Sequence, residues 1–535
     1  MPQKRFLPFN LDPVLVAILI IAAFLLLYRL DHRPFWQDEA ETACLARNVL
    51  KYGIPIGFDG VNLVSQEEGR EYRTDYVWRW SPWAQIYVAA AAFKVGGLGT
   101  TAGRFPFALI GLVSIWLVYF LVMRRFDDIG WARLSALFLT FMVPFLLFSR
   151  QCRYYSLGGF LTLVFIFAFR GKWQSRLGPA AALVACMVLL FYTNYLLLFS
   201  FAASFAVSAL LLYREELPVW RIVWMVIAAA ALIIPGLGFY QLGQQSGLMD
   251  LTLYPYQFGR YLEEVCRYVV PLPLGVALLW RWRRLLDAKR HPDSPAEKFV
   301  IFLSIIIFVS ITILALVPQY SFRYLVHLLP LCAIILAWIT LQVWQFSRFS
   351  AVFLALLLIC TNWLHVIPMD LLGMERPPLN DFNMLSTPNI PLRLFLLEIN
   401  SDEQDSDQGI ANFLNAHAQP GDTVMTTYGD LPLQFYTSCR VLGSLQGKVP
   451  ELARLPDWVI VRHHPGRNRD ALLFDSEEYV RWRLRLDEGY KAVALPCLDE
   501  RYGNIPNPHV HWFLPLSEPF VNVVIHRRQS ETAND

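Results

Sequence analysis

The chain has 535 residues, of which 56% are hydrophobic, 15% aromatic and only 17% charged. Because about a quarter of the residues of a soluble globular protein are charged, this composition indicates a polytopic membrane protein. The formal net charge of +3 and the lack of a long basic tract argue against a protein that binds nucleic acid.

The first apolar run covers about residues 13–30 and follows Lys4 and Arg5. No small-residue cleavage site comes after it, so we expect a retained first span rather than a removed signal peptide. Further apolar runs are long enough to cross, or nearly cross, a bilayer, which predicts about 11 transmembrane helices in all. These runs lie at 104–123, 131–148, 154–169, 178–193, 195–213, 222–240, 262–280, 299–317, 324–345 and 351–368.

A weaker apolar run at 81–97 decides the sidedness of everything that follows it. If this run does not cross and the N-terminus is cytoplasmic, the inner loops hold 14 lysine and arginine residues and the short outer loops hold four. A crossing at 81–97 would invert that bias, against the positive-inside rule. We therefore expect 81–97 to lie in or dip into the outer face, within a first outer loop with amphipathic helices at 31–103.

The composition changes after residue 368, in a tail that the same topology places outside the cytoplasm. Residues 369–407 contain a proline-rich and an acidic stretch, which are typical of a linker. Residues 408–535 start with a helix-like segment and continue with strand-like segments such as "WVIV" and "FVNVVIH". We predict a helical membrane domain at 1–368 and a small extracytoplasmic α/β domain at 408–535.

Three acids, Asp38, Glu39 and Glu41, lie just beyond the first span in "RPFWQDEAETACLARNVLKYG". Asp38 is a good helix N-cap, and Glu41 three residues later completes a capping box. Gly53 and Pro55 would end such a helix at about residue 52. An ordinary helix start explains these acids as well as a reacting site does.

Arginines gather on the same expected outer face. Arg150 and Arg153 share one outer segment, Arg104 opens the second span, and Arg323 precedes a later one. Any single arginine at a bilayer edge can extend to water or lipid headgroups. Three arginine-containing outer segments beside an acidic loop instead indicate a site for an anionic phosphate with a carboxylate next to it.

The order of these motifs resembles that of polytopic glycosyltransferases with the GT-C fold, above all the protein O-mannosyltransferase and lipid A aminoarabinose transferase families. Those families share an Asp-Glu pair that opens a helix, a proline-containing amphipathic stretch, an arginine at the start of the next span, an R-x-Y-type segment and an R-Y motif. The matching segments here are "DEAETACLARNVLKYG", "WRWSPWAQIYVAAAAF", "GRFPFALIGL", "RQCRYYSL" and "FRYLVHLLP", and they cover about 31–335. The chain departs at Trp80-Ser81-Pro82, where the two families have His-Pro-Pro or Lys-Pro-Pro, so we assign neither mannose nor aminoarabinose.

The resemblance implies a multi-pass enzyme of the cell membrane that moves a sugar from a polyprenyl-phosphate donor to a hydroxyl acceptor, with inversion, on the extracytoplasmic side. Such a reaction needs a base for the acceptor proton and cations for the departing phosphate. By the same resemblance the candidate residues are Asp38 as base, Glu39 paired with Arg104 to orient the loop, Arg153 and Arg323 with Tyr154 and Tyr324 at the donor phosphate, and Asp75 as a second loop carboxylate near the sugar. No catalytic metal or cofactor is implied, because arginines can supply the positive charge.

A transporter or flippase is the alternative class. It would need charged groups near the middle of the bilayer and spans broken by glycine or proline in corresponding halves. Most charges here lie at the ends of the predicted spans, and no internal repeat is visible. We therefore favour the transferase, with membrane lipids and a lipid-linked sugar as partners and no nucleic acid; the sugar and the acceptor stay open.

Overall fold

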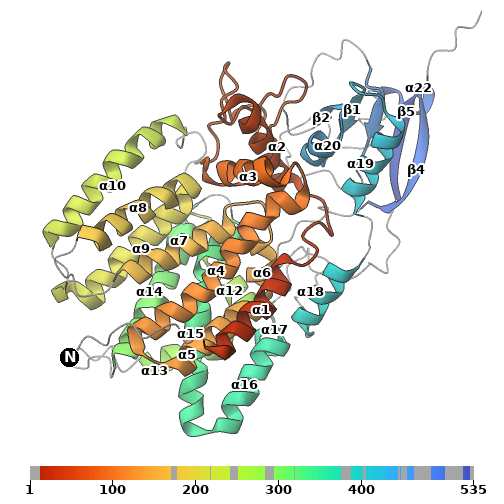
Figure 1. Cartoon of the computed structure of the whole chain (residues 1–535). Coiled ribbons are helices and arrows are strands. Elements are labelled where there is room, and N and C mark those ends of the chain that lie inside the picture. Colours follow the sequence, from red (N-terminus) through yellow and green to blue (C-terminus); the bar gives the residue numbers. More distant parts are fainter. Residues whose placement is uncertain are drawn as a thin grey trace, which may run out of the picture.

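The computed structural model describes residues 12–169, 177–216, 219–240, 242, 251–282, 294–317, 320–374, 387–401, 405–443, 446, 455–462, 484–499 and 522–529. Most helices form one bundle (Figure 1). The segment at 31–103, expected to be the first outer loop, lies at one end of this bundle, beside a small sheet that is formed by the tail of the chain.

Among the described residues, five helical segments are long and apolar enough to cross a membrane. They are α4 (Thr100–Phe126), α9 (Tyr195–Tyr213, followed by η1, Arg214–Glu216), α10 (Val219–Phe239), α14 (Pro295–Leu314) and the combined segment of η3 (Phe322–Leu328) and α15 (Leu329–Phe346). Two further candidate spans are the bent pairs of α5 (Ile129–Phe141) with α6 (Val143–Ser149) and α16 (Arg348–Cys360) with α17 (Trp363–Leu371). Shorter apolar helices are α1 (Pro13–Leu27), α3 (Ala84–Gly96), α7 (Tyr155–Ala168) and α8 (Leu177–Thr193). The number of crossings stays a prediction.

Three of the expected spans are broken rather than continuous. The breaks lie at Met142, with a bend of 65°, at Thr361–Asn362, with a bend of 86°, and between α12 (Tyr254–Tyr268) and α13 (Leu272–Trp282). Proline accounts for two of them, because Pro144 and Pro271 lack the N–H that a continuing helix needs and would clash with the preceding turn. The runs 131–148, 262–280 and 351–368 are therefore corrected to pairs of shorter helices.

The first outer loop carries α2 (Gln37–Tyr52) and α3, which pack against each other. Helix α3 has 13 residues, which corresponds to about 20 Å and is short of a hydrocarbon core of about 30 Å. Helices α1 and α7 are nearly as short, with 15 and 14 residues, so whether 81–97 crosses the membrane stays a prediction. The shared core of the loop is formed by the buried side chains of Phe35, Trp78, Ile86, Phe93, Phe107 and, from the tail, Leu431.

Helix α2 starts without the predicted capping box. Trp36 is its N-cap residue and makes no side-chain capping bond, and Asp38 is the second helical residue. The expectation that Asp38 caps the helix is therefore wrong, because its carboxylate is bonded to an arginine from a distant segment instead. The C-terminal end is as expected: Gly53 ends the helix with a φ of +79°, a left-handed conformation that favours glycine.

The tail folds into the predicted small α/β domain. Its described strands form one sheet in the order β2-β1-β3-β5-β4, in which β1 pairs parallel with β2 and β3, while β5 pairs antiparallel with β3 and β4. The elements are α19 (Ser406–His417), β1 (Thr423–Thr426), α20 (Asp430–Tyr436), β2 (Arg440–Gly443), β3 (Trp458–Ile460), α22 (Leu486–Gly489), β4 (Tyr490–Leu498) and β5 (Asn522–Arg528). Part of the expected linker is also helical, as α18 (Pro391–Asn400).

Helix α20 joins this domain to the first outer loop. Gln37, the first residue of α2, donates its side-chain N–H to Asp430 Oδ1 (2.7 Å). The hydroxyl of Tyr436 accepts a hydrogen bond from the backbone N–H of Phe35 (2.9 Å). Leu431 is fully buried in the core that α2 and α3 share. The acidic end of α2 is therefore held by the tail domain as well as by the bundle.

Candidate active site

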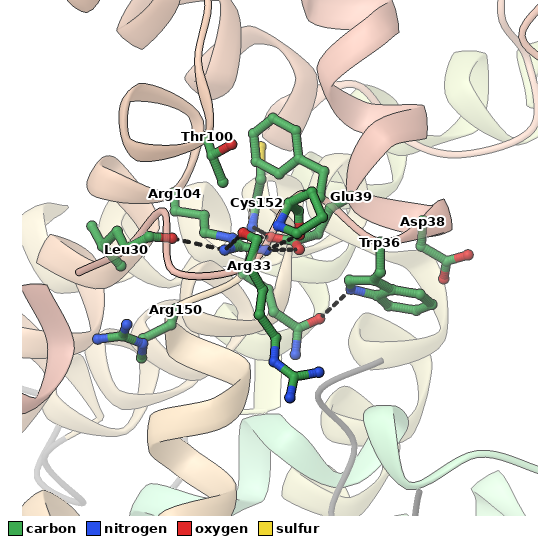
Figure 2. Close-up of polar contacts among 12 residues, drawn as sticks. Leu30, Arg33, Trp36, Asp38, Glu39, Thr100, Arg104, Arg150 and Cys152 are labelled. Carbon is green, nitrogen blue, oxygen red and sulfur yellow. Dashed lines mark hydrogen bonds and ion pairs between the residues drawn. The ribbon is translucent and has the colours of Figure 1, made fainter. Parts of the chain in front are cut away.

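Asp38 and Glu39 leave the first turn of α2 in different directions. Figure 2 shows the carboxylate of Glu39 turned toward Arg104 and Cys152, whereas the carboxylate of Asp38 is turned away from that pair. Consecutive helical residues are about 100° apart around the helix axis, so two adjacent acids can face different surroundings. The two carboxylates are consequently described one at a time.

Glu39 forms a closed ion pair with Arg104. Nε and Nη2 of Arg104 donate to the two carboxylate oxygens (2.8 and 2.6 Å), and the backbone N–H of Cys152 donates to Oε1 (2.7 Å). Nη1 and Nη2 of Arg104 also donate to three backbone carbonyls of residues 30–34 (2.7–2.9 Å). Glu39 is 0% exposed. The predicted Glu39–Arg104 pair is confirmed, and it ties α2 to the start of α4 and to the segment that leaves the first span.

Asp38 lies in a more open cluster with the two arginines that were predicted at the donor phosphate. Arg323 Nη1 donates to Asp38 Oδ2 (2.6 Å), and Arg153 Nη2 is 3.5 Å from the same oxygen. The other oxygen, Oδ1, has a single long contact among the described residues, with the side chain of Gln66 (3.5 Å). The side chain of Arg323 is 29% exposed and that of Asp38 14%, so this pair can be reached from outside.

A third acid, Glu41, also belongs to this cluster. Arg153 Nη1 donates to Glu41 Oε1 (2.9 Å), and Gln66 donates to Oε2 (2.7 Å). Burial raises the pKa of Glu41, the attraction of Arg153 opposes this shift, and the negative charge of Asp38 adds to it. The sequence suggested only a capping role for Glu41, although its i, i+3 spacing from Asp38 places both acids on one helix face. No sequence signal pointed to Gln66.

Tyr154 and Tyr324 each follow one of the two arginines in sequence, and their rings lie beside the guanidinium groups. The guanidinium of Arg153 lies 5.9 Å from the ring of Tyr154, and that of Arg323 lies 5.4 Å from the ring of Tyr324. The hydroxyl of Tyr154 and the Nε atoms of both arginines are buried and have no hydrogen-bond partner among the described residues. A buried donor without a partner is unfavourable, so these three donors favour a bound acceptor such as an anion.

Two other candidates lie outside this cluster. Asp75 forms an exposed two-point ion pair with Arg79 (2.6 and 2.7 Å), and the structure gives it no contact with Asp38 or either phosphate arginine. Arg150 donates to four backbone carbonyls at the end of α1, between Leu25 and Arg29 (2.9–3.2 Å). Arg150 therefore caps the first span, and Figure 2 places it apart from Asp38.

Comparison with solved structures identifies the fold. ArnT from Cupriavidus metallidurans bound to undecaprenyl phosphate is 13% identical and matches with a TM-score of 0.56 over 97% of this chain and 98% of that chain. The same protein without the lipid is 12% identical and matches with a TM-score of 0.57, over 96% and 97%. The oligosaccharyltransferase AglB from Archaeoglobus fulgidus, in complex with an inhibitory peptide and a dolichol-phosphate, is 12% identical and matches with a TM-score of 0.50, over 96% and 76%. No family model and no curated protein matches the chain.

These likenesses confirm the fold that the motif order predicted. Both proteins have the GT-C fold, and the match to ArnT, an aminoarabinose transferase, runs over nearly the whole of both chains. At such low sequence identity the likeness concerns the fold, so residue roles must be argued from the geometry of this chain. The chain is a GT-C-fold polytopic membrane protein with a small α/β domain at its C-terminal end.

Proposed function

We propose that this chain is a membrane glycosyltransferase that moves a sugar from a polyprenyl-phosphate donor to a hydroxyl acceptor, with inversion of the sugar. One observation carries the proposal: a partly exposed carboxylate, Asp38, lies between two guanidinium groups that have donors to spare. The reaction needs this combination, since a proton must leave the acceptor while a phosphate departs from the sugar. The lipid phosphates in the names of the two related structures agree with such a donor.

Asp38 Oδ1 is the oxygen that would act as base, because Oδ2 is already held by Arg323. Oδ1 takes the proton of the acceptor hydroxyl as the acceptor oxygen attacks the anomeric carbon from the face opposite the phosphate. The bond between that carbon and the phosphate oxygen breaks, and the phosphate leaves with the electron pair. Direct displacement of this kind inverts the anomeric centre.

Arg323 and Arg153 would hold the departing phosphate. Each carries an Nε donor without a hydrogen-bond partner among the described residues, and the more exposed Arg323 is the first that a ligand meets. Guanidinium groups bind phosphate through paired, charge-assisted hydrogen bonds and thus stabilise the charge that develops on the leaving group. The two arginines provide that charge without a metal ion. Glu39 and Arg104 act as positioning residues that fix α2.

The proposal places the site on the extracytoplasmic side. The distribution of basic residues between loops supports this orientation. A reporter that is active only outside the cytoplasm should be active when fused at Gly97 or after Asp535 and inactive when fused near Asp287. An inactive fusion at Gly97 together with an active one at Asp287 would invert the orientation.

In the decisive experiment, purified full-length protein is incubated with a panel of polyprenyl-phosphate sugars. An extract of the same membrane supplies the hydroxyl acceptor. We expect one donor to be consumed and free polyprenyl phosphate to be released, which mass spectrometry detects. Variant Asp38→Asn should abolish the release, while Asp75→Asn, which removes an exposed acid outside the cluster, should not. The protein could instead move an intact lipid-linked sugar across the membrane of proteoliposomes without releasing polyprenyl phosphate. That result would show a flippase rather than a transferase.

A further inference from the structure

A cavity lies where two of the broken spans, α5 with α6 and α16 with α17, come together. It reaches the break at Met142 between α5 and α6 and the break at Thr361–Asn362 between α16 and α17. Its wall is mainly apolar and includes Phe138, Phe141, Leu336 and Ile359. None of the residues assigned to the donor phosphate or to the base lines this cavity.

One cation, Arg267 of α12, lines this apolar cavity. Its side chain is 1% exposed, and only one nitrogen, Nη2, donates a hydrogen bond, to Glu263 Oε1 (3.3 Å). Nη1 is 3.9 Å from Asp370, beyond hydrogen-bonding distance, and neither Nε nor Nη1 has a hydrogen-bond partner among the described residues. Two guanidinium nitrogens are thus buried with unused donors, an arrangement that is unfavourable unless an acceptor reaches them.

Two polar neighbours of Arg267 in the cavity bond to backbone carbonyls. His365 uses Nδ1 to bond the backbone carbonyl of Cys266 (2.9 Å). Thr361 donates its hydroxyl to the carbonyl of Leu357 (2.8 Å). These bonds satisfy backbone carbonyls near the C-terminal ends of α12 and α16. Neither bond supplies an acceptor to Arg267. Among the described residues, Arg267 therefore has ion-pair partners in Glu263 and Asp370, but Nε and Nη1 have no hydrogen-bond acceptor.

We propose that this cavity binds an anionic membrane phospholipid, with its phosphate against Arg267 and one acyl chain along the apolar wall. Phosphate oxygens are strong acceptors that can engage several guanidinium donors at once. An acyl chain would cover the apolar part of the wall at Phe138, Phe141 and Ile359.

The test uses purified full-length protein in detergent, with bound lipid counted by native mass spectrometry and thermal stability measured in parallel. Phosphatidylglycerol should be retained and should raise the melting temperature more than zwitterionic phosphatidylcholine does. Arg267→Gln keeps the length of the side chain but removes the charge, so retention of phosphatidylglycerol should fall by about tenfold or more. Arg348→Gln makes the same change at an exposed position of α16 and should leave retention unchanged.

A second variant keeps the proposal testable if Arg267→Gln does not fold. Ile359→Trp fills the apolar wall at a half-exposed position and should also displace the lipid. Equal retention of phosphatidylglycerol by wild type, Arg267→Gln and Ile359→Trp would overturn the proposal. It would likewise be overturned if glycerol phosphate alone reproduced the full stabilisation, or if undecaprenyl phosphate competed for the site and excluded phosphatidylglycerol, which would make the cavity part of the donor site. None of these readouts depends on transferase activity.

Discussion

Asp38 and Glu39 are adjacent acids with the same charge, and they occupy opposite kinds of environment. Glu39 is fully buried, and both its oxygens are held by Arg104 and a backbone N–H. Asp38 is partly exposed, and one of its oxygens has only a 3.5 Å contact. A saturated carboxylate holds a structure together, whereas a carboxylate with an unused oxygen can exchange a proton. The number and geometry of donors, rather than residue type, assign the two roles.

The largest expected effect is that of Asp38→Asn. An amide cannot take a proton at neutral pH, so the transfer rate should fall by about two to four orders of magnitude. Folding and insertion should be preserved, because Asp38 neither caps α2 nor lies in its core. The measurement is the release of polyprenyl phosphate from the donor, with the melting temperature recorded for the same preparation. Near-normal release would remove Asp38 from the chemistry.

Glu39→Gln should instead affect stability and activity together. It removes a fully buried partner of Arg104, and breaking one side of a buried ion pair typically destabilises a protein by about 3 kcal/mol or more. The amide keeps one acceptor oxygen, so partial function should survive. Thermal unfolding of the purified variant measures the effect. If Glu39→Gln lost only turnover, with an unchanged melting temperature, the contrast between the two acids would fail.

A substitution of Arg323 asks whether the open cluster binds phosphate through its shape or only through its charge. Arg323→Lys keeps the charge and loses the planar fork, so donor binding should weaken by about 10- to 100-fold. Titration with a polyprenyl phosphate, without an acceptor, measures this directly. Arg79→Lys is the matched control, because Arg79 pairs with Asp75 outside the cluster. An unchanged affinity of Arg323→Lys would exclude Arg323 from the phosphate site.

The smallest expected effect concerns a third acid, Asp430, which meets α2 from the tail domain. Burial raises the pKa of Asp430 from 3.8 to about 6, so the folded state holds a proton that the unfolded state releases. The stabilising contribution is present below about pH 4 and is lost as the pH rises through about 6. A two-unit shift corresponds to at most about 3 kcal/mol, and relaxation of the interface should reduce it to about 1 kcal/mol.

Asp430→Asn cannot titrate and should flatten this part of the pH dependence. The difference in melting temperature between wild type and variant, followed from pH 4 to pH 7, isolates the contribution of Asp430 from that of other groups. Glu68→Gln, which alters a partly exposed acid of the first outer loop, should not change the profile. A wild-type curve parallel to that of Asp430→Asn would show that the carboxyl does not titrate in this range.

The sequence predicted those parts of the site that repeat a family pattern. The Glu39–Arg104 pair and the meeting of Asp38 with Arg153 and Arg323 followed from motif order, although Arg323 lies 285 residues from Asp38. The capping role of Asp38 was wrong because local preference could not foresee the arginine that holds its carboxylate. Tertiary packing determines three further features: the contacts of Gln66 with the acids, the bond between Gln37 and Asp430, and the position of Arg267 in a cavity wall. No local pattern encodes them.

The breaks in the helices show the same limit of prediction from local sequence patterns. Hydropathy located the apolar runs, but apolar residues score alike in a straight span and in a bent one. Pro144 and Pro271 were visible as helix breakers, whereas the bend at Thr361–Asn362 has no proline at the break. The contact of Asn362 with the backbone of Thr387 and Asn389 stabilises that bend from a separate segment.

The bond between Gln37 and Asp430 joins residues 393 positions apart. During synthesis, the helix that bears the acids leaves the ribosome long before the segment that covers it. Until then Leu431 is missing from the core between α2 and α3. The acidic end of α2 is therefore completed late, so a nascent or truncated chain should present the cluster around Asp38 in an unfinished form.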